Sequence, residues 1–201
     1  MSALDFRCTG CGNCCRALRV AVTALDVARL ASATGKPAAA LVAWLAPDAV
    51  DMTGEPQSFV ELSEGRRLMV LAQRDGACLL LDTADRCAAY AARPRDCRAF
   101  PFDFERAADG PRLQLLPLVG CDHAHDGVND RAMLEAEDAE RWRELEAYQG
   151  VIARWNRRVF HRRRLGKPSG NADSFLAFAL TEADAGDVHG EPAPSSPLTP
   201  S

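Results

Sequence analysis

Four of the chain's eight cysteines lie within eight consecutive residues, in the segment CTGCGNCC at positions 8–15. The residues between these cysteines are Thr9, Gly10, Gly12 and Asn13, which are typical of turns rather than of a buried core. Free thiols gathered so closely are open to oxidation unless a ligand holds them. The segment therefore favours a metal site over the burial of cysteine as a small apolar residue.

The spacing within this segment indicates how many thiolates one metal centre receives. Cys8, Cys11 and Cys14 recur every third residue, so one turn carries all three around a point, and the glycines let backbone amides approach the sulfurs. The fourth ligand is either Cys15 or, since neighbouring side chains usually diverge, a cysteine distant in the sequence. In the second case Cys15 is free to join a second site. The remaining candidate ligands are Cys78, Cys87, Cys97 and Cys121.

The cysteine pattern is compatible with zinc and with an iron–sulfur cluster. Zinc takes four tetrahedral thiolate or imidazole ligands. An iron–sulfur cluster also takes four cysteines, and a tight three-cysteine loop with a remote fourth resembles the ferredoxin arrangement, which slightly favours the cluster. Because so many cysteines compete for the metal, we expect His123 and His125 to be exposed polar residues rather than ligands. Arg93 and Arg98, near Cys97, either offset the thiolate charge or form packing salt bridges.

Two motifs in a fixed order give the chain a resemblance to a known family. The motif C-x2-C-x2-C-C at residues 8–15 is followed by C-x8-C-x2-Y-x2-R-P-x2-C-R-x-F-P at residues 78–101. Together they resemble the bacterial YkgJ-type cysteine-cluster family, described as a suspected zinc- or iron-chelating domain, over residues 5 to 122. The resemblance implies metal binding without a defined chemistry. Flagellin lysine methylases carry a similar cysteine cluster.

Composition and charge exclude several classes of partner. The formal net charge is -4 and the sequence pI is about 5.6, which predicts no general affinity for nucleic acid or an anionic membrane. No apolar run is long enough to span a membrane, and the first residues lack the features of a secretory signal. We therefore expect a cytoplasmic protein, in which thiols stay reduced and clustered cysteines bind metal rather than form disulfides.

Local patterns predict an α+β fold, with a small antiparallel sheet and surrounding helices organised around a cysteine-ligated metal centre. Thr23 and Gly35 are expected to cap a helix, and Pro94 to begin a short helical turn. The expected helices are residues 24–34, 37–45, 131–164 and 171–183. The expected strands are residues 58–62, 67–73, 77–81 and 112–119, with turns at Glu64–Gly65 and Asp75–Gly76.

The helix expected at residues 131–164 has apolar residues on one face at heptad spacing, which indicates core packing. Its acidic residues come early and its basic residues late, which complements the helix dipole. The alternative is that its basic segment RRVFHRRR meets an acidic or phosphorylated partner. We expect three parts: a cysteine-cluster metal-binding domain at 1–125, a C-terminal helical extension packed on it at 126–186, and a disordered tail at 187–201.

These observations favour a metal-binding protein that holds an iron–sulfur cluster or zinc and acts in electron transfer, sensing or metal handling. The alternatives are a zinc-stabilised protein-interaction module, which adds a protein to the candidate partners, and part of a methylase-like enzyme. The chain has no Gly-rich nucleotide loop after a strand, no G-x-S-x-G and no H-E-x-x-H. We therefore assign no catalytic residue, and the question of enzymatic activity stays open.

Overall fold

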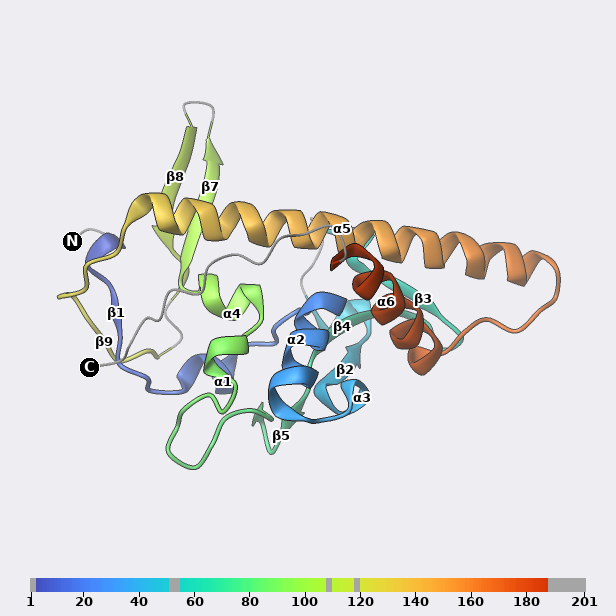
Figure 1. Ribbon diagram of the computed structural model, residues 1–201, viewed down its shortest axis with the longest axis horizontal. Helices are drawn as coiled ribbons and strands as arrows, with labels where there is room; N and C mark the ends of the chain where they lie inside the picture. The colour runs from blue at the N-terminus through green and yellow to red at the C-terminus, as the bar shows by residue number, and fades with distance from the viewer. Residues whose placement is uncertain (1–2, 51–54, 108–109, 118–119, 188–201) are drawn as a thin grey trace.

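The computed structural model describes residues 3–50, 55–107, 110–117 and 120–187, and it has the predicted α+β character (Figure 1). In these residues the strands form several small antiparallel sheets rather than one. The α-helices are α1 (Asn13–Ala17), α2 (Ala24–Thr34), α3 (Ala38–Leu41), α4 (Arg95–Ala99), α5 (Arg131–Arg164) and α6 (Ala172–Asp187). The strands are β1 (Arg7–Cys8), β2 (Val42–Leu45), β3 (Val60–Leu62), β4 (Gly65–Leu71), β5 (Gln73–Arg74), β6 (Ala77–Cys78), β7 (Phe102–Ala107), β8 (Gly110–Leu115) and β9 (His123–Ala124). Short 3-10 helices lie at Ala3–Asp5, Pro47–Ala49, Pro56–Ser58 and Tyr90–Ala92.

The central sheet has the strand order β2–β4–β3, and both pairs are antiparallel. The predicted turn between β3 and β4 is confirmed, because Leu62 pairs with Gly65, whose φ of 105° suits glycine. The helix predicted at 37–45 is wrong beyond Leu41. Residues 42–45 pair instead with residues 68–71 of β4, because strand pairing outweighs the weak local preference of an apolar run that fits either structure.

Helix α2 begins and ends where its capping residues predict. The Thr23 hydroxyl accepts a hydrogen bond from the Asp26 backbone N–H, and the Asp26 carboxylate accepts one from the Thr23 N–H. Gly35 closes the other end with a φ of 66°. The helix therefore presents Val27 and Leu30, both fully buried, to the core.

One hydrophobic core joins the sheet and α2 to the two C-terminal helices. The apolar face of α5 packs inward through Tyr148, Ile152 and Trp155, so the prediction that this face serves the core is confirmed. Phe175 of α6 is fully buried, with its ring centroid 5.4 Å from that of Trp155. The core thus crosses the boundary expected near residue 125, and that boundary stays a prediction.

Side chains of α5 cover the outer edge of β3. The Trp155 indole donates to the carbonyl of Glu61 at 2.9 Å, and the Asn156 amide oxygen accepts the Glu61 N–H at 2.8 Å. Arg163 donates to the Leu62 carbonyl at 2.8 Å and pairs with the Glu61 carboxylate. At least one arginine of the basic segment therefore fixes α5 against the sheet and blocks an open strand edge.

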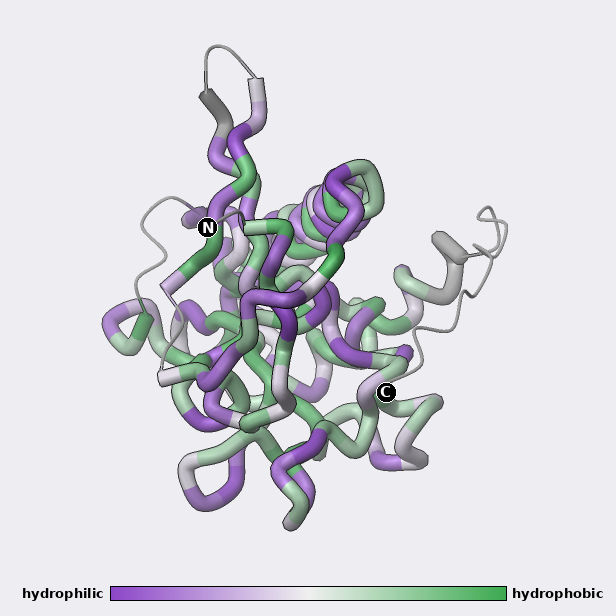
Figure 2. Tube along the Cα trace, turned by 90° about the vertical axis from the view of Figure 1, so that its left-hand side faces the viewer, coloured by the Kyte–Doolittle hydropathy of each residue, from purple (hydrophilic) through white to green (hydrophobic). Residues whose placement is uncertain are grey.

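Strands β7 and β8 form a hairpin that projects from the body beside the first half of α5 (Figure 1). Hydrophilic and hydrophobic residues both occur along its strands (Figure 2). The strand predicted at 112–119 corresponds to β8 up to Leu115, and residues 118–119 lie outside the described residues. Strand β7 was not predicted, although its sequence FDFERA begins with the alternation of a half-buried strand.

The C-terminal helices match the predictions closely. Helix α5 spans the predicted residues 131–164, and Asn171 caps α6 by accepting the Ser174 N–H at 3.0 Å. Helix α6 extends to Asp187, and the rest of the tail predicted at 187–201 lies outside the described residues. None of the helices among the described residues has the length and apolarity needed to cross a membrane.

We predict that Phe175→Ala lowers the free energy of unfolding by about 3–5 kcal/mol, because it leaves a cavity among aromatic rings. Urea unfolding followed by circular dichroism measures this loss. Phe160→Ala is the matched control, since Phe160 is 63% exposed and its removal should change stability by less than about 0.5 kcal/mol. Equal effects in the two variants would contradict this description of the core.

Candidate metal centre

The segment CTGCGNCC folds as a turn followed by the short helix α1. Gly10 and Gly12 have φ values of 73° and 69°, in the left-handed region that favours glycine. Gly12 is also packed closely, because a Cβ there would lie 3.1 Å from the Asp85 carbonyl oxygen and 3.2 Å from a methyl group of Leu81. Only glycine therefore lets this turn approach the segment that contains Cys78 and Cys87.

A second segment, residues 120–124, is held against the same turn. Strand β1 pairs with β9, which places Cys8 opposite His123. The Thr9 hydroxyl donates to the carbonyl of Asp122, and the Asn13 amide donates to the carbonyl of Gly120 at 2.6 Å. These contacts bring Cys121 to the cysteines at the N-terminus.

The first thiol group consists of Cys8, Cys11, Cys14 and Cys121. The Sγ atoms of Cys11 and Cys121 lie 3.7 Å apart. Cys8 and Cys14 lie within electrostatic range of Cys121, and the Gly10 N–H points to the Cys8 sulfur at 3.4 Å. Backbone N–H groups of Asn13 and Asp122 also lower the pKa of Cys11, as donors to a thiolate do.

The chain between Cys78 and Cys87 makes a closed turn. Leu81 forms an antiparallel bridge with Cys87, and the Ala88 N–H donates to the Leu80 carbonyl at 2.8 Å. The Asp82 carboxylate accepts backbone N–H groups of Ala84 and Arg86 inside the turn. This geometry brings together two cysteines that are nine residues apart in the sequence.

The second thiol group consists of Cys15, Cys78, Cys87 and Cys97. Cys15 and Cys78 lie close enough to shift each other's pKa, and Cys87 lies within electrostatic range of both. Cys97, from α4, lies within the same range of Cys15 and Cys78. Three segments far apart in the sequence therefore supply this group.

Burial and neighbouring thiols together set the pKa values of these cysteines. A hydrogen bond with Cys14 lowers the pKa of Cys15, but the hydrogen bond with Cys78 and burial outweigh it and raise the pKa to about 11. Burial and the neighbouring Cys15 raise the pKa of Cys97, which Arg93 opposes. Burial, followed by the Cys11 thiol, raises the pKa of Cys121 to about 11. A metal cation among the sulfurs would reverse this trend, because it stabilises thiolates.

The donor set fits a thiophilic metal such as zinc or iron. Both groups offer four sulfurs, and backbone N–H groups donate to Cys8, Cys11 and Cys78. In the part of the chain that the structure describes, no three Cys, His, Asp or Glu side chains already form an arrangement that holds an ion. The thiols of each group are close to one another, and ligation of a metal would require them to move closer.

The predicted arginines and histidines occupy different settings. Arg93 lies over the Tyr90 ring, 3.7 Å from its centroid, and its charge favours the thiolate of Cys97. Arg98 pairs with Glu137 at 3.5 Å. The His123 ring stacks on Phe6. The predicted roles of these residues towards a metal stay predictions.

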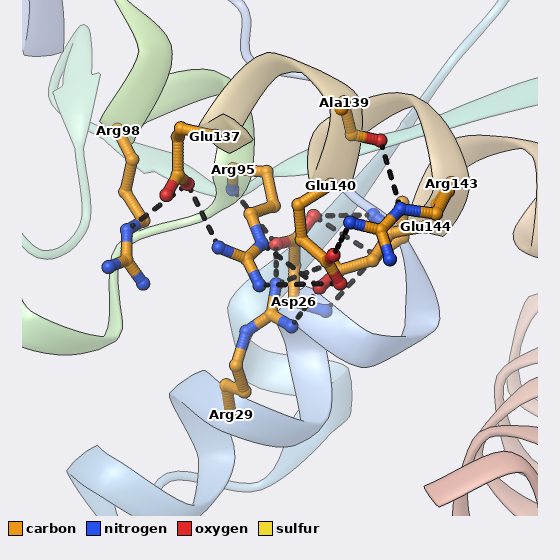
Figure 3. A network of polar contacts seen from close by, with 10 residues as sticks. Asp26, Arg29, Arg95, Arg98, Glu137, Ala139, Glu140, Arg143 and Glu144 are labelled. Carbon is orange, nitrogen blue, oxygen red and sulfur yellow. Dashed lines mark hydrogen bonds and ion pairs between the residues drawn. The ribbon is translucent and has the colours of Figure 1, made fainter. Parts of the chain in front are cut away.

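A network of charged side chains connects α4, which carries Cys97, to α2 and α5. Figure 3 shows its members. Arg95 donates to Glu144 and Glu137 of α5, both at 2.9 Å, and its backbone N–H donates to Asp26 of α2 at 3.0 Å. Arg29 donates to both oxygens of Glu144 at 2.8 Å. Asp26 and Glu144 are only 3% and 7% exposed, so their charges depend on these arginines.

Sequence reasoning missed this network, because its members look like ordinary surface charges when read one at a time. The one residue that could have indicated the network is Asp26. One oxygen of its carboxylate caps α2 by accepting from Thr23, which leaves the other oxygen to accept a hydrogen bond from elsewhere in the chain. Burial opposes the ionisation of Glu144, yet hydrogen bonds from Arg29 and Arg95 outweigh it and hold the pKa of that carboxyl below its usual range. The network therefore remains charged and connects α2, α4 and α5 at neutral pH.

Comparison with known proteins finds one family. Residues 7–115 match the model of the CxxCxxCC family, described as "Putative zinc- or iron-chelating domain". No curated protein and no solved structure matches the chain. The matched region includes seven of the cysteines described above and ends before Cys121.

We predict that Arg95→Met lowers the free energy of unfolding by about 2–3 kcal/mol, because it removes charged hydrogen bonds from buried carboxylates. It should also speed amide exchange in α4. Arg143→Met is the matched control, because Arg143 pairs with Glu140 while 70% exposed and should contribute at most about 1 kcal/mol. If both variants lose the same stability, the network does not position α4.

We predict that Gly12→Ala disturbs the turn more than Gly10→Ala, although both glycines have left-handed backbones. Each substitution costs about 1–2 kcal/mol of backbone strain. Only the Cβ at residue 12 also meets Leu81 and Asp85, whereas the Cβ at residue 10 meets nothing within 4 Å. Rates of thiol alkylation, read by mass spectrometry, should rise at Cys78 and Cys87 only in Gly12→Ala. Equal rates in the two variants would contradict the close packing.

Proposed function

This chain belongs to the CxxCxxCC family, and from that premise we propose that it is a metal-chelating protein whose ligands are clustered cysteine thiolates. The proposed ligands are Cys8, Cys11, Cys14, Cys15, Cys78, Cys87, Cys97 and Cys121. The proposal places the protein in the cytoplasm, where thiols remain reduced and available to a metal.

The observation that carries this proposal is the convergence of thiols from separate segments. The turn at residues 8–15, the turn at 78–87, helix α4 and the segment at 120–124 meet in one region. Partial burial and neighbouring thiols raise the pKa values of Cys15 and Cys121 to about 11, so these two thiols have little tendency to ionise on their own. A divalent cation supplies the missing stabilisation.

The spacing of two sulfurs supports a single tetrahedral ion over the four-iron type of iron–sulfur cluster. Sulfurs bound at 2.3 Å to one tetrahedral zinc lie about 3.8 Å apart. The Cys11 and Cys121 sulfurs lie 3.7 Å apart. In a four-iron cluster each cysteine binds its own iron, so the cysteine sulfurs lie farther apart. We therefore propose zinc, or iron bound as a single ion, where the sequence alone slightly favoured a cluster.

Burial supports a stabilising role for the metal. Within residues 7–20, Gly12 is the one buried residue, so this segment contributes no buried apolar side chain. Its order depends on hydrogen bonds, on the ion pair of Arg16 with Asp85, and, in this proposal, on thiolate ligation. Electron transfer would require a redox-active metal. The identity of the bound metal therefore distinguishes an electron-transfer role from a purely stabilising one.

The test is metal analysis of the protein purified without oxygen, together with a Cys11→Ser variant. We expect the native protein to contain zinc or iron without inorganic sulfide, and the variant to lose metal and to exchange amides faster at residues 8–15. His161→Ser is the control, because His161 is an exposed potential ligand on α5, far along the chain from the cysteines.

Three results would count against the proposal. A native protein that binds neither zinc nor iron would contradict chelation, and unchanged metal in Cys11→Ser would exclude this cysteine as a ligand. A brown protein that contains inorganic sulfide would replace the single ion with an iron–sulfur cluster.

A further inference from the structure

We propose that the eight cysteines form two adjoining metal centres, each with four thiolate ligands. The first centre uses Cys8, Cys11, Cys14 and Cys121, and the second uses Cys15, Cys78, Cys87 and Cys97. This inference rests on the proposed function and assigns its ligands. It also places Cys121, which lies beyond the residues 7–115 matched by the family model, in the first centre.

The first centre is supported by contacts between the two ends of the cysteine region. Cys121 touches Cys11, with 3.7 Å between their sulfurs, and also lies within electrostatic range of Cys8 and Cys14. No member of the second group is among the principal neighbours of Cys121. The pairing of β1 with β9 and the hydrogen bond from Asn13 to Gly120 fix this arrangement through the backbone.

The second centre is supported by the position of Cys15. Its principal neighbours in this group are Cys78 and Cys87, and it also lies within electrostatic range of Cys97. Packing of α1 against β6 and of Gly12 against Leu81 fixes Cys15 beside Cys78. Arg93 adds positive charge beside Cys97, which a centre with four thiolates needs.

The adjacent cysteines in α1 explain why the groups divide where they do. Successive residues of an α-helix point about 100° apart, so Cys14 and Cys15 cannot both turn fully towards one ion. Cys14 lies near Cys11 and Cys121, whereas Cys15 lies near Cys78 and Cys87. Cys97 lies within electrostatic range of both Cys14 and Cys15, and Cys15 has the larger effect on it. Because Cys14 and Cys15 are consecutive in the chain, the two centres adjoin at this pair.

Ligand number supports the same division. One zinc or iron ion takes about four thiolates, so eight thiols exceed the need of a single ion. All eight cysteines are free thiols, and each has at least one other cysteine among its principal neighbours. Two tetrahedral sites use every thiol and leave none reactive.

The first experiment uses the unaltered chain, reduced, freed of metal and titrated with zinc. We expect about two equivalents per chain by native mass spectrometry, because each centre takes one ion. Replacement of zinc by ¹¹³Cd should give two NMR signals in the region of thiolate ligands. One equivalent and one signal would overturn the division while leaving metal chelation in place. No binding at all would refute the proposed function instead.

The second experiment removes half of each ligand set. Cys11→Ser/Cys121→Ser should retain one equivalent and lose one of the two cadmium signals. Cys78→Ser/Cys87→Ser should retain one equivalent and lose the other signal. His161→Ser, the control, should keep both. If either double variant loses both ions, or if both variants lose the same signal, the assignment of ligands is wrong. The cadmium spectrum of the native chain decides the number of centres even if a variant fails to fold.

Discussion

Two carboxylates, those of Asp26 and Glu144, are buried between two arginines where α2, α4 and α5 meet. Asp26 caps α2, and Glu144 lies in the middle of α5, yet Arg29 and Arg95 contact both. Buried charges are costly unless they are paired, so the network has few alternative arrangements. It thereby fixes the angle between α2, α4 and α5, and Arg95 connects the hydrophobic core to a cysteine two residues away in α4.

The sequence predicted those parts of the fold that depend on neighbouring residues. Capping by Thr23 and Gly35 defined α2, and the heptad pattern with its basic end defined α5. The helix expected at 37–45 was wrong beyond Leu41, because an apolar run does not reveal whether its neighbours are in the next turn or in another strand. Only the pairing of β2 with β4 settles this, and that pairing involves residues far apart in the sequence.

Prediction of the candidate site was also limited to what neighbouring residues in the sequence indicate. The clustering of cysteines and the spacing of residues 8–15 were enough to predict a metal site, which the family match supports at the coarse level of zinc or iron chelation. The arrangement of the thiols in two groups could not be predicted, because it depends on which distant turn each thiol meets. Cys121 reaches Cys11 through the pairing of β1 with β9, strands of two residues each that carry almost no sequence signal.

The apolar core and the turn at residues 8–15 are therefore stabilised by different interactions. Phe175, Trp155 and Leu30 belong to an apolar core that needs no metal. The turn at residues 8–15 has hydrogen bonds instead, and exposed ion pairs of Arg7 and Arg16 flank it; both kinds of contact contribute little net stability. Loss of metal should then loosen the cysteine region locally while the core remains folded, because stability need not be uniform across a chain. If the chain chelates metal as proposed, such local opening would also let metal enter and leave without global unfolding.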